Sequence, residues 1–121
     1  MVIKREEMKL ERREPFAGGR GGGTLRHAIP PGASIPGSRF RLVSQVALDP
    51  GAEIGEHVHA DNEEIYWVLS GSGVFLDDGR EVPARPGDLI LTRRGQAHGL
   101  RNTGGELLVC LAVVAGEPAP E

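Results

Sequence analysis

The 121-residue sequence is poor in aromatic residues, has a single cysteine and contains no long hydrophobic run. It has three Phe, one Trp and one Tyr, and its net charge is −3, so it lacks the basic face with interleaved aromatics of a general nucleic-acid-binding protein. No apolar segment approaches the roughly 20 residues that a membrane-spanning helix needs. We therefore expect no nucleic acid and no membrane as a partner.

The N-terminus and the cysteine favour a cytoplasmic protein with a reduced thiol. Residues 1–10 carry charge but neither the apolar core nor the small-residue cleavage site of a secretory signal. Cys110 lies inside an apolar run that extends from Leu107 to Val114, which is typical of a buried, unreactive thiol.

Glycine and proline, in contrast, are abundant and spread along the chain, with 18 and 9 copies. This composition predicts many short elements joined by tight turns. Residues 40–48 alternate with a period of two and end at the turn Asp49-Pro50-Gly51, which predicts a strand. Further strands are predicted at intervals of about ten residues, the spacing of an all-β sandwich or barrel. They cover residues 65–69, 74–76, 81–82, 88–92, 98–102 and 106–114.

We expect one domain, because the length of 121 residues is close to the commonest length of a single domain and leaves little room for a second core. Residues 37–116 are predicted to form it, with residues 117–121 as a C-terminal tail. Residues 1–36 are predicted to be an N-terminal arm, partly flexible or associated with a dimer, because charged residues and a Gly-Arg stretch dominate it. His27, within this arm, is expected to be solvated.

The tripeptide His57-Val58-His59 is the most informative feature of the sequence. On a strand, residues i and i+2 share a face with Cβ atoms about 7 Å apart, so two imidazoles can converge on one metal ion. A turn follows, and an antiparallel strand returning from it would bring a carboxylate opposite the histidines. Glu63 and Glu64 are both candidates, and periodicity alone does not choose. If Glu64 points inward, Tyr66 shares its face.

These residues resemble the two motifs of the cupin superfamily. The first motif, G-x5-H-x-H-x3 or 4-E-x6-G, is matched by Gly51, His57, His59, Glu64 and Gly71, and its last spacing selects Glu64 over Glu63. The second, G-x5-P-x-G-x2-H-x3-N, is matched by Gly87, Gly95, His98 and Asn102, with Arg93 in place of the family's proline. This replacement puts the local loop geometry in doubt rather than the site, because proline shapes a turn and binds no metal.

The resemblance implies an all-β double-stranded β-helix, or jelly-roll β-barrel. It also implies that one divalent transition-metal ion (Mn, Fe, Ni, Co, Cu or Zn) is bound by His57, His59, Glu64 and His98. The matching glycines are implied to be turn positions. The segment 63–73 and the compact single domain look like small bacterial cupins often compared with oxalate decarboxylases.

Three neutral imidazoles and one carboxylate around a divalent ion leave a charge of about +1, which should attract anionic ligands. Our leading hypothesis is therefore a small-molecule metalloenzyme acting on a carboxylate or a vicinal-dioxygen compound, of the decarboxylase or dioxygenase type. Two alternatives remain open: a non-catalytic module that senses a small ligand, and an isomerase acting on a sugar or keto acid.

Three further residues are candidates for the pocket. Tyr66 is the candidate catalytic residue, as a hydrogen-bond or proton donor on the inward face of Glu64. Arg41 and Gln45 share one face of the strand 40–48 and are candidate substrate-binding residues, although the opposite, more apolar register also remains open.

The alternation of inward and outward residues from 64 to 69 predicts self-association. With Glu64 inward, Ile65, Trp67 and Leu69 form an apolar outward row that one small domain does not cover. We expect a symmetric homodimer, with the N-terminal arm as a candidate for crossing between subunits.

Overall fold

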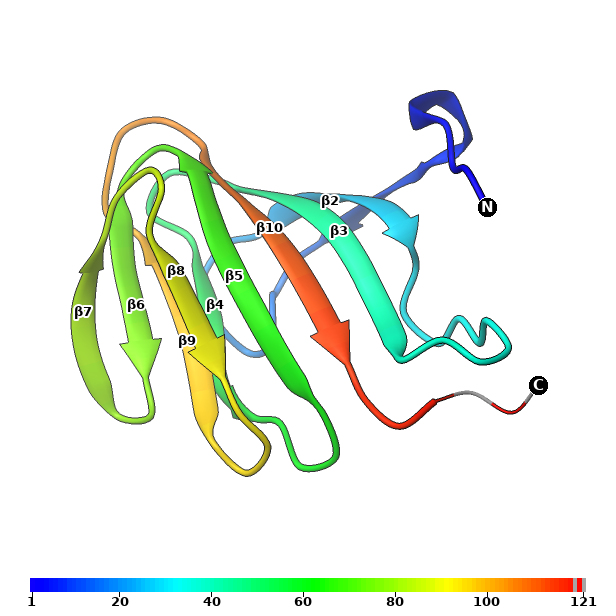
Figure 1. The fold of residues 1–121 in the computed structure, drawn as a ribbon. Coiled ribbons are helices and arrows are strands. Elements are labelled where there is room, and N and C mark those ends of the chain that lie inside the picture. Colours follow the sequence, from blue (N-terminus) through cyan, green and yellow to red (C-terminus); the bar gives the residue numbers. More distant parts are fainter. Residues whose placement is uncertain (119, 121) are drawn as a thin grey trace.

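The computed structural model describes residues 1–118 and 120, which fold into two facing β-sheets (Figure 1). The six-stranded sheet has the order β1 (Lys9–Arg13), β2 (Gly23–Ile29), β3 (Phe40–Leu48), β10 (Leu108–Ala115), β5 (Glu63–Ser70) and β8 (Leu89–Thr92). The four-stranded sheet has the order β4 (Glu53–Val58), β9 (Ala97–Asn102), β6 (Gly73–Asp77) and β7 (Arg80–Ala84). Within the described residues, the single helical element is the 3₁₀ turn η1 (Arg5–Glu7), and no helix could span a bilayer.

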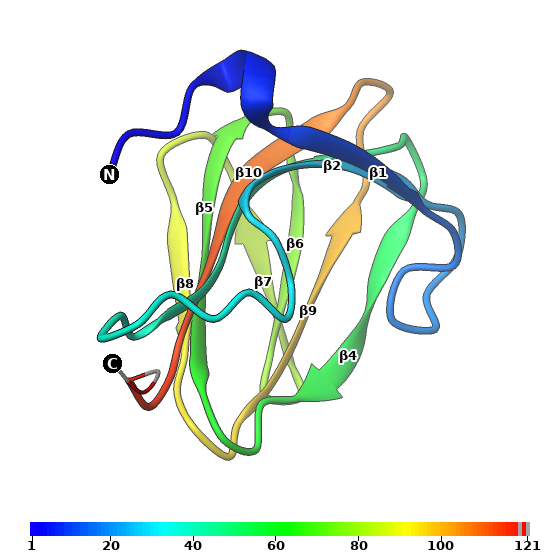
Figure 2. The same cartoon turned by 90° about the vertical axis from the view of Figure 1, so that its right-hand side faces the viewer.

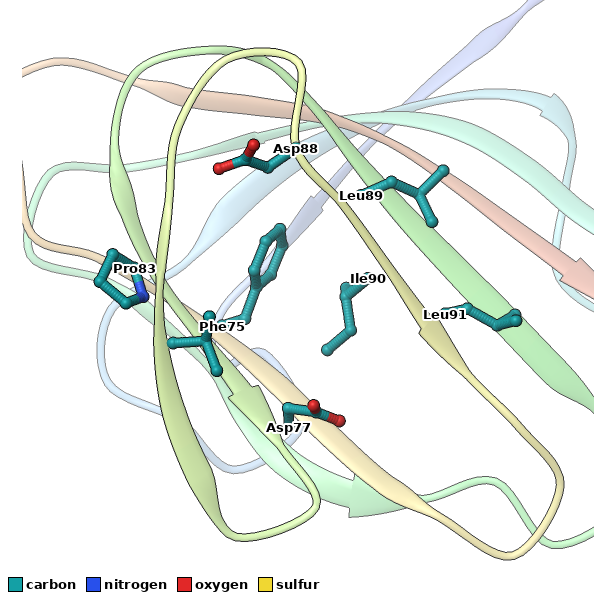
Figure 3. Close-up of a pocket in the computed structure, with 8 residues that line it drawn as sticks. Phe75, Asp77, Pro83, Asp88, Leu89, Ile90 and Leu91 are labelled. Atoms are coloured by element: carbon teal, nitrogen blue, oxygen red, sulfur yellow. The ribbon is translucent and has the colours of Figure 1, made fainter.

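The predicted all-β jelly-roll fold is confirmed, but the sheet does not close into a barrel. Among the described residues, β7 and β8 are edge strands of different sheets, and no ladder joins them. A cavity of about 420 Å³ lies on this open side, where side chains of β6, β7 and β8 meet (Figure 3). Phe75 and Ile90 are its buried apolar members, and Asp77 and Asp88 add two carboxylates.

The core lies between the two sheets and is built from alternating positions of the strands. In β10, the inward residues Leu108, Cys110, Ala112 and Val114 are buried, while the residues between them are half-buried. Such a period of two is what a strand with one face on a core requires. Burial raises the pKa of the Cys110 thiol to about 12, so the expected unreactive thiol fits its position.

Much of the predicted N-terminal arm belongs to the six-stranded sheet. β2 pairs with β3 along its length, which places Leu25 opposite Val46 in the core, and β1 pairs with β2 (Figure 2). Phe16 also enters the core. His27 is only 6% exposed, so the expectation that it is solvated was wrong, because β2 turns this residue inward. The predicted tail, residues 117–121, lies partly outside the described residues.

The turns implied by the motif glycines are present. A positive φ allows a chain reversal that side chains with a Cβ resist. At the end of β5, a Cβ on residue 71 would lie 2.5 Å from the carbonyl oxygen of Leu107, so no larger residue fits there without movement. Positive φ values are found at all four matching glycines: Gly51, Gly71, Gly87 and Gly95.

Candidate metal centre

The four predicted ligands come together from both sheets. His57 on β4 pairs directly with His98 on β9, and His59 follows the end of β4. Glu64 lies on β5, in the opposite sheet. The prediction that an antiparallel strand returns beside the histidines was therefore wrong. The carboxylate of Glu64 reaches them across the interior, because β4 and β5 belong to different sheets. Glu64 is buried and Glu63 exposed, as the motif spacing favoured.

The Nε2 atoms of the three histidines and one oxygen of Glu64 converge. The Nε2 atom of His98 lies 2.9 Å from that of His59 and 3.2 Å from that of His57. Glu64 Oε1 lies 2.9 Å from His59 Nε2 and 3.0 Å from His98 Nε2. All four candidate donor atoms are within 4.8 Å of one another.

These separations suit six-coordination better than four-coordination. Two donors bound at about 2.1 Å are about 3.0 Å apart when they subtend 90° at the metal, and about 3.4 Å apart at the tetrahedral angle. The four short contacts, from 2.9 to 3.2 Å, are close to the octahedral value. Four protein donors in such an arrangement leave two positions for a ligand.

Each imidazole is held by its other nitrogen, Nδ1. His57 Nδ1–H donates to the carbonyl oxygen of Gly55 at 2.7 Å, and His59 Nδ1–H donates to Asn62 Oδ1 at 2.5 Å. In both rings, the neutral form then has its acceptor lone pair on Nε2. The Nε2 of His59 lies 2.9 Å from Glu64 Oε1, and the Nε2 of His57 lies 3.2 Å from His98 Nε2. Acceptors packed this closely repel unless a cation lies among them, so the residues present fit a metal ion.

The charges of the cluster are coupled. Burial would raise the pKa of Glu64, but hydrogen bonds that His59 and His98 donate when protonated, together with the charges of those rings, outweigh burial and lower it. Glu64 in turn raises the pKa of His59 against the effect of burial. His98 is fully buried, and burial lowers its pKa despite the neighbouring carboxylate. Protons therefore compete with a metal ion for this site, mainly at His59.

Tyr66 lies beside the cluster on the inward face of β5. Its ring stacks on that of His98, with centroids 4.4 Å apart and planes 15° from parallel. Burial, followed by the charge of Glu64, raises the pKa of the Tyr66 hydroxyl well above its usual value, while Arg13 acts in the opposite direction. The hydroxyl therefore stays protonated at neutral pH and can donate a hydrogen bond.

A cavity of about 170 Å³ opens next to the cluster. Its polar lining comes from Arg13, His59, Glu64 and Tyr66, and its other walls are apolar. The apolar residues are Phe16, Leu25, Leu42, Val46, Ala112 and Val114.

The structure places Arg41 and Gln45 away from this cavity, so their predicted position in the pocket is corrected. The inward register of β3 contains Leu42, Ser44 and Val46, which leaves Gln45 exposed on the outer face. Arg41 turns to the C-terminal segment, where its Nη2 donates to the carbonyl oxygen of Glu117. β3 adopts the register with its apolar residues inward, because the interior between the sheets favours Leu and Val over Arg and Gln.

The segment from β8 to β9 forms a hydrogen-bonded turn with Arg93 at the family's proline position. The backbone N–H of Gln96 donates to the carbonyl oxygen of Arg93, and Gly95 has a φ of +85°. Arg93 N–H donates to Gln96 Oε1 at 3.0 Å, a bond that proline could not make. The doubt over this loop therefore does not extend to His98, the metal-ligand position of this motif.

Sequence reasoning missed the polar residues that support or face the cluster. Thr92 Oγ1 lies 2.8 Å from His98 Nδ1, and Asn62 holds His59. Arg13 reaches the cavity from β1, a strand that the sequence did not predict. The alternation of Glu11 and Arg13 was a weak signal for that strand, masked by its high charge.

Comparisons with known proteins agree with this architecture. The model of the family described as "Cupin domain" matches residues 44–114. The "Oxalate-binding protein" of Thermotoga maritima is 37% identical over 114 residues, which cover 94% of this chain and 93% of that protein.

Solved structures give the same result. A crystal structure from Thermotoga maritima, described as a predicted oxalate decarboxylase, superposes with a TM-score of 0.83 and 34% identity over 97% of this chain and all of that one. The polyketide cyclase RemF of Streptomyces resistomycificus has a TM-score of 0.71 and 27% identity, over 99% of this chain and 82% of its own. The fold, the motif residues and these matches together show that the chain is a member of the cupin family.

Proposed function

We propose that this protein binds a divalent transition-metal ion through His57, His59, Glu64 and His98 and uses it to bind a small carboxylate such as oxalate. The observation that carries the proposal is the convergence of four donor atoms beside a small cavity that also contains a cationic side chain. The name of the Thermotoga maritima relative, an oxalate-binding protein, supports the choice of ligand.

Different residues of the chain would bind the metal ion, donate a hydrogen bond to the ligand and exclude water. The three histidines and Glu64 would hold the ion, which could be Mn, Fe, Co, Ni, Cu or Zn, since all accept this mixed nitrogen and oxygen set. When bound, a divalent ion supplies positive charge and open positions for carboxylate oxygens. Tyr66 would donate a hydrogen bond from its neutral hydroxyl to a ligand in the cavity, and the apolar walls would exclude water.

The size of the cavity narrows the ligand class. Pockets for drug-sized ligands have volumes of about 300–1,000 Å³. At about 170 Å³, this cavity suits an anion of a few heavy atoms better than a polyketide. A decarboxylase or dioxygenase acting on a small carboxylate is therefore the enzymatic form we favour, and a ligand sensor or an isomerase is the alternative.

The test combines metal analysis, calorimetry and turnover. Purified protein should contain about one tightly held transition-metal ion, and His98→Ala should lose it, because one of four donors is removed. Wild-type protein loaded with Mn²⁺ should bind oxalate, and metal-free protein should not. Equal metal content in His98→Ala, or equal oxalate binding without metal, would contradict the proposal. Carbon dioxide release or oxygen consumption with oxalate would favour an enzyme, and tight binding without turnover would favour a sensor.

We also propose that the protein is a homodimer. The outer face of the six-stranded sheet contains four large apolar side chains that are 43–47% exposed, namely Trp67, Leu69, Leu89 and Leu91. Trp67 and Leu69 belong to the outward row that the sequence predicted, and β8 adds the two leucines. Exposed apolar patches of this kind are typical of protein interfaces.

A further inference from the structure

Arg13 is the one arginine or lysine, among the described residues, that lines the cavity beside the candidate metal centre. It lies at the end of β1, and its guanidinium stands 4.9 Å from the centroid of the Phe16 ring. Glu64 and His59 line the same cavity. A small ligand in this space therefore meets the candidate metal ligands and the guanidinium of Arg13 together.

Arg13 is held by a chain of hydrogen bonds that extends into the core. Its Nε and Nη2 donate to the two oxygens of Glu11 at 2.9 and 3.0 Å. Glu11 Oε1 also accepts from His27 Nε2–H at 2.8 Å, and His27 Nδ1 lies 2.6 Å from Ser44 Oγ. His27 and Ser44 are 6% and 1% exposed, so the series of hydrogen bonds that holds Arg13 ends on buried residues of the core.

This anchoring leaves part of the guanidinium available. Arginine has five N–H donors, and the two bonds to Glu11 use one on Nε and one on Nη2. Within residues 1–118 and 120, no hydrogen bond from Nη1 is found. A guanidinium that is fixed on one edge and free on the other is well suited to donate hydrogen bonds to a carboxylate, because little side-chain entropy is lost on binding.

We propose that Arg13 is the second anion-binding group of the site and selects dicarboxylates over monocarboxylates. The inference rests on the proposed function: one carboxylate of the ligand would meet the metal, and the other would accept hydrogen bonds from Arg13. Glu11 is a positioning residue that orients Arg13. The competing interpretation is that Arg13 only ties β1 to the rest of the sheet through Glu11.

The experiment compares oxalate with acetate by calorimetry on Mn²⁺-loaded protein, because acetate has no second carboxylate to reach Arg13. Arg13→Gln should weaken oxalate binding about tenfold or more and leave acetate binding within about twofold. Arg12→Gln is the matched control: Arg12 is the neighbouring arginine, is salt-bridged to Asp49 and does not line the cavity. It should leave both affinities unchanged.

Three outcomes separate the interpretations. Oxalate affinity unchanged in Arg13→Gln, at equal metal content and melting temperature, would overturn the role of Arg13 alone. An equal loss for oxalate and acetate would show a structural role and overturn it as well. Failure of the wild type to bind oxalate would overturn the proposed function together with this inference. Should Arg13→Gln not fold, Arg13→Lys replaces it: an oxalate-specific loss of about threefold is expected, because lysine has no two-pronged geometry, and unchanged affinity counts against the role.

Discussion

At the scale of single residues, the direction of each imidazole depends on the partner of the nitrogen that faces away from the metal position. His57 and His59 donate from Nδ1 to oxygen acceptors, which commits their Nε2 atoms to the cluster. The ring of His98 is held between Thr92 on one side and the face of Tyr66 on another. Such outer contacts fix the tautomer and orientation of a ligand and thereby its affinity for metal.

The variant Thr92→Val tests whether the contact at His98 Nδ1 contributes to metal affinity. Valine has nearly the shape of threonine but cannot bond to His98 Nδ1, 2.8 Å away. We expect metal affinity to fall about tenfold while the fold is retained, because the ring is less well oriented. Competition with a coloured chelator measures the affinity. Thr103→Val, in the exposed turn after β9, is the control, and equal affinities in the two variants would contradict the argument.

The candidate ligands could be predicted from sequence because their spacings are local. Two histidines at i and i+2, then a carboxylate five residues later, form a pattern that can be read along the chain. The supporting residues have no such pattern. Thr92 and Asn62 are ordinary turn-forming or strand residues by type, and only the fold places their oxygens against imidazole nitrogens. The same holds for Arg13, whose approach depends on β1 pairing with β2.

At the scale of elements, β1 is an edge strand with few apolar contacts. Its inward side chains are Glu11 and Arg13, so backbone pairing and the hydrogen bond between Glu11 and His27, rather than apolar contacts, attach it to β2. The hydrogen bond from Arg13, followed by that from His27, lowers the pKa of Glu11 from 4.5 to about 2. The carboxylate thus stabilises the folded state more when ionised than when protonated.

The attachment of β1 should therefore weaken in acid. Because the folded pKa is depressed, the contribution of Glu11 is complete above pH 4.5 and is lost as the pH falls toward 2. The side chain is 41% exposed, so we expect at most about 1 kcal/mol. The free energy of unfolding should differ between wild type and Glu11→Gln at pH 6, and this difference should shrink at pH 3. A difference that does not change with pH would count against the argument.

Strand prediction succeeded where alternation was strong and failed where pairing was non-local. The bounds of β3 matched the expected strand, because its apolar and polar residues alternate clearly. Its two possible registers were not distinguishable locally, and burial of Leu42 and Val46 against the core decided between them. β1 and β2 contain glycine, arginine and glutamate, so their strand structure depends on partners that the local sequence does not reveal.

At the scale of the whole molecule, the outer face of the six-stranded sheet is largely apolar where β3, β10, β5 and β8 lie side by side, with Gln45 as a polar member. One row across the sheet runs from Val43 through Val113 and Ile65 to Leu91. The next row runs from Gln45 through Leu111 and Trp67 to Leu89. The hydrophobic effect favours covering such a face, and a two-fold axis lets the same patch serve both subunits.

We expect the wild type to be a dimer at micromolar concentration and the double variant Trp67→Glu, Leu89→Glu to be a monomer. These two residues are paired across β5 and β8, so the variant places two carboxylates per subunit where about 800 Å² of each subunit would be buried in a standard-sized interface. Sedimentation equilibrium measures the state. Leu107→Glu, which changes a similarly exposed leucine in the loop before β10, beyond the strands that form this face, should remain dimeric. A monomeric wild type would contradict the proposal, and a dimeric double variant would place the interface elsewhere on the molecule.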